Sequence, residues 1–166
     1  DQMTVEELAS QLADMFGTAE VASVGKPAFS EGDGTASVGS NTFPEEYGDT
    51  RDVCLYPSST VAACTWSPER LQRRGELLAE EALYCNLPSF WAGGGNIHRT
   101  PFGGRNGEYY SEDSILTYLY TEIQLSATQS RGVSPGIKHL AGNDQELYRE
   151  GLVMFFNEQA FREGAL

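Results

Sequence analysis

The sequence predicts an α/β fold with a parallel sheet at its centre. Two segments with apolar residues at helical spacing, 68–82 and 114–129, alternate with short apolar runs that suit buried strands. Polar loops follow two of these runs, at 96–113 and at 139–149, and loops after parallel strands commonly carry the chemistry of such folds. The chain of 166 residues is long enough for one domain with a hydrophobic core.

The N-terminal third is expected to combine one helix with a long loop region. Residues 4–7 read Thr-Val-Glu-Glu, the pattern of a capping box in which the Thr hydroxyl and the last Glu carboxylate satisfy free amides of a helix. Apolar residues then recur at helical spacing as far as Met15. The range 17–52 is rich in Gly, Ser, Thr, Pro and acidic residues, which predicts long loops with little regular structure.

The rest of the chain carries signals for helix ends and for short strands. Ser67 followed by Pro68 predicts a helix start, because Ser caps free amides and Pro fits the first helical position. Gly132 is placed to end the helix over 114–129, and Asn157 is placed to cap a last helix. Short strands are expected at the apolar runs 53–56, 87–91, 136–140 and 152–156.

The composition argues against several classes of partner. The net charge of -13 and the pI of about 4.4 argue against nucleic acid, whose phosphates select a basic face. No membrane partner is expected, because no apolar run approaches the length of a bilayer span. No cofactor is expected either, because the glycines at 93–95 lack the spacing of a nucleotide-binding loop.

The three cysteines bear on metal binding and on the cellular compartment. Cys54, Cys64 and Cys85 form an odd set without CxxC spacing. We therefore expect reduced thiols, with neither a disulfide framework nor a metal site. Reduced thiols favour a cytoplasmic location over a secreted one.

The polar loop at 96–113 is unusually dense in hydrogen-bonding side chains. It holds one His, two Arg, three acidic residues, two Tyr and two Asn. Each sugar hydroxyl can donate and accept, so this loop suits a polyhydroxylated ligand, with Trp91, Tyr109 and Tyr110 offering flat apolar faces to a ring. An ion-paired structural loop is the alternative, and composition does not separate the two.

Lys138 and His139 stand together at the end of an expected strand. Adjacent strand residues point to opposite faces, so both side chains reach one site only if the strand has ended or bulges there. A surface Lys beside a packed His is the alternative, and the pair taken by itself favours that alternative.

Two long motifs resemble those of glycoside hydrolase family 3, the group that includes most bacterial β-glucosidases. The loop at 96–113, with Asn-Ile-His-Arg, Gly-Arg-Asn and Glu-Tyr-Tyr-Ser-Glu-Asp, is similar to the longest signature of that family. Residues 138–146 resemble its Lys-His-Phe segment and the Asn-rich loop after it, with Leu140 in place of Phe. The resemblance covers about 55–166 well, and before that point residues 32–34 resemble the family's Asp-Gly-Pro turn.

The resemblance implies a fold and a set of substrate-binding residues. It implies that 1–166 is a partial N-terminal catalytic barrel domain, roughly the first half of a (β/α)8 TIM-like barrel, with 17–52 as a long loop region within it. In the family, the sugar is held by the Asp of the Asp-Gly turn, the Arg of Gly-Arg-Asn and the Lys-His pair. In this sequence those substrate-binding roles fall to Asp33, Arg105, Lys138 and His139.

The same resemblance implies that the catalytic groups lie outside this chain. Retaining glycosidases use two carboxylates about 5–5.5 Å apart, and in the family both come from segments later than the last residue here. Glu108, Glu112 and Asp113 could be read as a catalytic set. The resemblance instead makes these acids structural partners of Arg99 and Arg105.

The expected function is hydrolysis of terminal non-reducing β-D-glycosidic bonds by a retaining, β-glucosidase-like enzyme of which this chain is a part. Its partners would be a β-glucoside or related small saccharide and the remainder of the barrel, which another chain could supply. By itself the chain is expected to be inactive. The alternative is a non-catalytic carbohydrate-binding or structural half-barrel. The N-acetylglucosaminidase branch of the family is disfavoured, because it uses a His shortly after Lys-His and none follows His139.

Overall fold

The computed structural model describes residues 2–12, 17–39 and 53–166. It is built on a four-stranded sheet with the order β1-β2-β3-β4. β1 runs antiparallel to β2, whereas β2, β3 and β4 are parallel to one another. The strands are β1 (Gly17–Thr18), β2 (Phe29–Asp33), β3 (Ser89–Gly94) and β4 (Ser134–Lys138). The predicted α/β class is confirmed.

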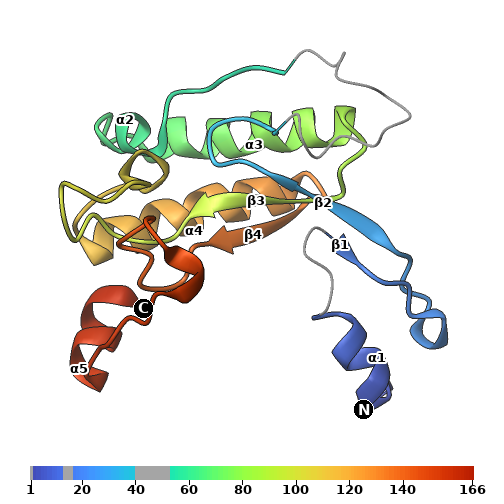
Figure 1. Cartoon of the computed structure of the whole chain (residues 1–166). Helices are drawn as coiled ribbons and strands as arrows, with labels where there is room; N and C mark the ends of the chain where they lie inside the picture. The colour runs from blue at the N-terminus through green and yellow to red at the C-terminus, as the bar shows by residue number, and fades with distance from the viewer. Residues whose placement is uncertain (1, 13–16, 40–52) are drawn as a thin grey trace.

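Two long helices pack against the parallel strands and against each other (Figure 1). α3 (Pro68–Tyr84) precedes β3, and α4 (Ser114–Ser130) connects β3 to β4. The carboxyl ends of β2, β3 and β4 therefore meet at one edge of the sheet, and the loops that follow them lie together. The shorter elements are α1 (Val5–Ser10), α2 (Ser59–Ala63), α5 (Glu158–Ala160), a π-helical turn at Phe161–Ala165 and 3-10 turns at Ala22–Val24, Asn106–Glu108 and Arg149–Gly151.

The predicted helix starts are confirmed because each depends on local hydrogen bonds. Thr4 and Glu7 form the capping box, with the Glu7 amide donating to Thr4 Oγ1 at 3.2 Å and the Thr4 amide donating to Glu7 Oε2 at 2.7 Å. Ser67 accepts from the Arg70 amide at the start of α3. Asn157 accepts from the amide three residues later and starts α5. Met15 lies outside the described residues.

The main core lies between α3 and the sheet. Leu78, Ala79 and Ala82 of α3 are fully buried against Phe90 and Ala92 of β3. Strand residues alternate between faces, so Trp91 points to the other side of β3, away from this core. A second core cluster forms around α2, with the residues Ala62, Ala63, Leu71, Tyr110 and Tyr120.

The range 17–52 differs from the expected loop region. It contains β1, a 3-10 turn and β2, while its residues 40–52 lie outside those that the structure describes. β2 has the polar sequence Phe-Ser-Glu-Gly-Asp, which carries almost no strand signal of its own. It is a strand because Glu31, Gly32 and Asp33 pair with β3, and that partner lies more than fifty residues further along the chain.

Two strands predicted from apolar runs are absent from the structure. Residues 53–56 form no strand, although the Tyr56 amide donates to the Ala36 carbonyl at 2.8 Å. Glu81 of α3 also holds them: Tyr56 Oη donates to Glu81 Oε1 at 2.7 Å, and the Cys54 amide donates to the same carboxylate at 3.3 Å. Residues 152–156 also lie outside the sheet, with Phe155 almost fully exposed. Within the described ranges, no helix combines the length and apolar character that crossing a bilayer requires.

We predict that Gly75→Ala destabilises the fold through the α3–α4 contact. A Cβ at this position would lie 2.6 Å from the carbonyl oxygen of Gln124 and 2.9 Å from the Cβ of Ala127. Overpacking of this kind costs about 1–3 kcal/mol. Because the closest contact is with a backbone atom, we expect the upper part of that range, above the gain of roughly 1 kcal/mol in helix propensity. Urea denaturation measures the free energy of unfolding. Gly107→Ala is the matched control, because its added methyl would meet nothing within 4 Å; equal stability of both variants would contradict the prediction.

Candidate functional site

Two parallel strands end in charged side chains that meet at the carboxyl edge of the sheet. Asp33 is the last residue of β2 and Lys138 is the last residue of β4, and both strands flank β3. Lys138 Nζ forms an ion pair with the Asp33 carboxylate. It also lies 3.6 Å from Glu108 Oε2 and 5.8 Å from the centre of the Trp91 ring. Only the pairing of β2 and β4 around β3 brings these groups together.

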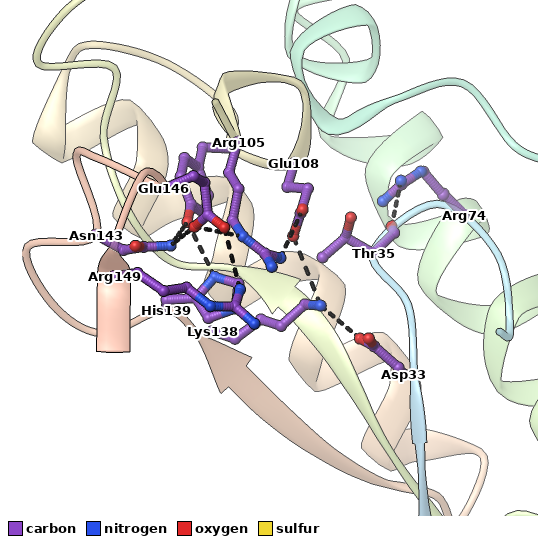
Figure 2. A network of polar contacts seen from close by, with 11 residues as sticks. Asp33, Thr35, Arg74, Arg105, Glu108, Lys138, His139, Asn143, Glu146 and Arg149 are labelled. Carbon is purple, nitrogen blue, oxygen red and sulfur yellow. Dashed lines mark hydrogen bonds and ion pairs between the residues drawn. The ribbon is translucent and has the colours of Figure 1, made fainter. Parts of the chain in front are cut away.

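The loop after β3 contributes Arg105 to the same edge. One terminal nitrogen of its guanidinium donates to Glu108 Oε1 at 2.9 Å, and its Nε lies 2.7 Å from Glu146 Oε1. Glu146 belongs to the loop after β4, and it also pairs with Arg149 at 3.0 Å. Arg105 thus connects two loops that are forty residues apart in the sequence (Figure 2).

His139 is oriented by a neighbouring tyrosine. Tyr109 Oη and His139 Nδ1 are 2.9 Å apart, and Asn143 Nδ2 donates to the same Tyr109 oxygen at 3.1 Å. When the Tyr109 hydroxyl donates to Nδ1, the ring carries its own proton on Nε2. Burial, followed by the charges of Arg105 and Lys138, lowers the pKa of His139. The imidazole is therefore neutral near pH 7.

These groups line an open cavity of about 550 Å³, which we call the sheet-edge cavity. All four predicted site residues, Asp33, Arg105, Lys138 and His139, lie on its wall. Lys138 and His139 both reach it because β4 ends at Lys138. The wall also includes Trp91, Leu140, Ala141, Gly142, Asn143, Gln145, Arg149, Leu152 and Met154. Within the described residues, no group of three or more His, Cys, Asp and Glu side chains is placed to hold a metal ion.

Comparison with known proteins identifies relatives over nearly the whole chain. A thermostable β-glucosidase B of Acetivibrio thermocellus is 33% identical over 98% of the chain, and β-glucosidase A of Butyrivibrio fibrisolvens is 35% identical over 98%. An exo-α-(1->6)-L-arabinopyranosidase of Bifidobacterium longum is 31% identical over 97%. No family model matches the sequence.

Solved structures agree with these relatives. β-Glucosidase 3B of Thermotoga neapolitana, in complex with glucose, superposes on 90% of the chain with a TM-score of 0.80 and 36% identity. The family 3 β-glucosidase of Bifidobacterium adolescentis superposes on 98% with a TM-score of 0.82 and 29% identity. This chain is homologous to the glycoside hydrolases of family 3. It spans about a fifth of the length of these relatives: 22% and 20% of the first two β-glucosidases, 22% of the arabinopyranosidase, and 21% and 23% of the two structures.

The tyrosines of the loop at 96–113 do not face the sheet-edge cavity as the sequence suggested. Tyr109 and Tyr110 were expected to offer flat faces to a sugar, but their side chains are buried at 1% and 2% exposure. Tyr109 reaches inward to His139, and Tyr110 donates to Gln124 Oε1 at 2.6 Å. Of the three aromatic residues considered, only Trp91 lines the sheet-edge cavity.

The acidic residues of the loop have structural contacts of different kinds. Glu108 pairs with Arg105 as predicted. Asp113 caps α4 by accepting from the Leu116 amide at 2.7 Å, a role that its place before a helix could have indicated. Arg99 was expected to pair with the acids of its own loop, but its ion pair is with Asp144 at 3.3 Å. That partner comes from the loop after β4, so its proximity depends on the tertiary fold.

Sequence reasoning missed three polar residues on the cavity wall. Asn143, Gln145 and Arg149 all belong to the polar loop after β4. The sequence indicated that this loop is polar, but it did not indicate which of its residues line the site. The available signal was their position within 139–149, directly after the Lys-His pair. Asn143 has an additional role, because it donates to Glu146 Oε1 at 3.0 Å and holds that carboxylate beside Arg105.

Proposed function

We propose that this chain provides the sugar-binding part of a retaining β-glucosidase, an enzyme that releases terminal non-reducing β-D-glucosyl groups. The observation that carries the proposal is the convergence of Asp33, Arg105, Lys138 and His139 on one cavity of about 550 Å³. A volume of this size suits a small ligand, and the residues reach it from three different strand ends. The resemblance to family 3 motifs identified these four residues as candidates, and the fold brings them to one cavity.

The chemistry of the cavity suits a neutral polyol. A carboxylate such as Asp33 can accept from two neighbouring hydroxyls, whereas Lys138 and Arg105 donate charge-assisted hydrogen bonds to hydroxyl oxygens. In the tautomer that is protonated on Nε2, neutral His139 adds a donor without adding a third cation to the pair of Arg105 and Lys138. The apolar ring of Trp91 completes the wall and could pack against a sugar face.

We propose that the catalytic carboxylate pair comes from polypeptide other than residues 1–166. Cleavage with retention needs one carboxylate as nucleophile and one carboxylic acid as proton donor. The carboxylates of the cavity region are committed to cations: Asp33 and Glu108 contact Lys138, and Glu146 contacts Arg105. These pairings fit binding and positioning roles.

We also propose that the sheet is roughly the first half of a (β/α)8 barrel, formed by a partial N-terminal catalytic domain over 1–166. Two features of the fold support this. The parallel strands β2, β3 and β4 are neighbours in the order of the sequence. The helices α3 and α4, which come before β3 and β4, pack against each other and against the strands. A barrel adds strands in this order and keeps its helices on the outside.

A non-catalytic carbohydrate-binding half-barrel is the second candidate. The observation in its favour is the same set of ion pairs, since among the described residues the cavity region holds binding groups but no free carboxylate pair. It would bind glucose with no turnover in any assembly. Calorimetric titration with glucose, paired with a hydrolysis assay of the assembled enzyme, separates the two functions.

We predict that the assembled enzyme prefers a plain β-glucoside to an N-acetyl-β-glucosaminide. The chain has two His, of which His98 is bound to the Tyr109 carbonyl oxygen at 3.0 Å and His139 is on the cavity wall, and no other follows to serve as the acetylated branch's acid/base. A panel of aryl glycosides, including an arabinopyranoside, measures kcat/KM for each sugar. We expect roughly tenfold or greater discrimination for glucose over its N-acetyl derivative; the reverse order would overturn the branch assignment.

A further inference from the structure

Arg74 carries a buried charge that sugar binding does not use directly. It lies in α3 at 6% exposure, and among the described residues no carboxylate pairs with it. Burial lowers the pKa of its guanidinium. An unpaired buried cation is costly unless oriented acceptors surround it. The acceptors that contact Arg74 therefore identify the segments that its guanidinium holds in place.

One of these acceptors belongs to the turn that follows Asp33. Arg74 donates to the backbone carbonyl of Thr35 (Figure 2). It also donates to the backbone carbonyl of Pro57 at 3.1 Å. The loop is closed on itself, because the Gly39 amide donates to the Asp33 carbonyl at 2.6 Å, and it begins at Gly34, whose φ of +146° suits glycine. The Thr35 carbonyl that Arg74 holds is therefore two residues from Asp33 within one closed loop.

The remaining acceptor ties Arg74 to the rest of the site. Its guanidinium donates to the side-chain oxygen of Gln124, a fully buried residue of α4. The same oxygen accepts from Tyr110 of the motif loop, and the Gln124 amide donates to the Ala92 carbonyl of β3 at 2.6 Å. One buried network thus fixes the Asp33 turn relative to β3 and to the loop that carries Arg105.

We propose that Arg74 is a positioning residue that holds Asp33 in place for the sugar by fixing the carbonyl of Thr35. The inference rests on the proposed function, in which Asp33 accepts from sugar hydroxyls. The separation of roles is geometric: Asp33 lines the sheet-edge cavity, whereas Arg74 is absent from its wall and approaches the turn from α3. A binding carboxylate is effective only in its productive geometry, and small displacements at such groups lower rates strongly.

The test is a double-mutant cycle between Arg74→Met and Asp33→Asn in the full enzyme that contains this chain. Arg74→Met removes the donors and keeps much of the volume. We expect it to lower kcat/KM for an aryl β-glucoside roughly tenfold when Asp33 is present, and less than about twofold in the Asp33→Asn background. Leu78→Ala is the control, because it also disturbs the buried face of α3 and should change kcat/KM equally in both backgrounds.

The outcomes distinguish sugar binding by Asp33 from the positioning role of Arg74. If Asp33→Asn leaves kcat/KM unchanged, the sugar-binding proposal fails. If Asp33→Asn lowers kcat/KM but Arg74→Met has no effect, or has the same effect in both backgrounds, only the positioning role of Arg74 fails. Should Arg74→Met not fold, Arg74→Lys serves in its place, since it keeps the charge but cannot reach all three acceptors. We then expect a smaller loss of kcat/KM that again depends on the presence of Asp33, and unchanged kinetics would overturn the inference.

Discussion

Arg105→Ala and Lys138→Ala are each expected to lower kcat/KM for an aryl β-glucoside about ten- to hundredfold in the assembled enzyme. In the proposed function each substitution removes a charged hydrogen-bond donor to the sugar, worth roughly 1.5–3 kcal/mol. The melting temperature should change less than the kinetics, because both side chains lie on the cavity wall and the side chains of the carboxylates they leave, Asp33, Glu108 and Glu146, are 28–32% exposed to water. Steady-state kinetics paired with thermal melts measure the two effects separately.

Arg131→Ala is the matched control for these variants. It removes a guanidinium that also pairs with two carboxylates, Glu76 at 3.1 Å and Glu80 at 3.5 Å, but on the outer surface of α3 and α4. Its kinetics should equal those of the unaltered enzyme, since exposed ion pairs contribute little even to stability. Normal kinetics in Arg105→Ala or Lys138→Ala would remove that residue from the sugar site.

The polypeptide of residues 1–166, expressed alone, is expected to hydrolyse no glycoside at a measurable rate. We expect activity at least about 10⁴-fold below that of the assembled enzyme, the scale of loss when a catalytic unit is incomplete. Cleavage with retention needs a carboxylate pair that can exchange a proton and form a covalent intermediate. Asp33 and Glu108 are instead held by Lys138 and Arg105.

The isolated polypeptide should also be prone to aggregation. Among the described strands, β4 has a neighbour on one side only, and an open strand edge can pair with other chains. Beside it lies a cavity of about 430 Å³ between α4 and β4, walled by apolar residues that include Leu125, Ile137 and Leu140. This is the surface that we expect the remainder of a barrel to cover.

The experiment is an aryl β-glucosidase assay of residues 1–166, alone and with the remainder of a family 3 enzyme supplied as a second polypeptide. Activity should depend on the second polypeptide, and light scattering should show less aggregation when it is present. Hydrolysis by the first polypeptide alone would contradict this account. It would return Glu108, Glu112 and Asp113 to consideration as a catalytic set.

The sequence alone determined the features that depend on near neighbours. The capping box at Thr4 and Glu7, the start of α3 at Ser67 and the last helix at Asn157 were all predictable, because each cap bonds an amide three residues away. The resemblance to family 3 also named the candidate site residues: Asp33 in the Asp-Gly turn, Arg105 in the loop at 96–113, and the pair Lys138 and His139. The short apolar runs were less informative: β3 and β4 formed, whereas 152–156 did not pair.

Only the tertiary structure decided which groups meet. β2 has a polar sequence and exists because it pairs with β3, and that pairing places Asp33 beside Lys138, 105 residues later. Tertiary packing likewise buries Tyr109 and Tyr110, and it surrounds the Arg74 charge with backbone carbonyls from distant segments. Strand pairing and burial depend on partners far along the chain, which local periodicity does not encode, whereas a helix cap depends only on residues within one turn.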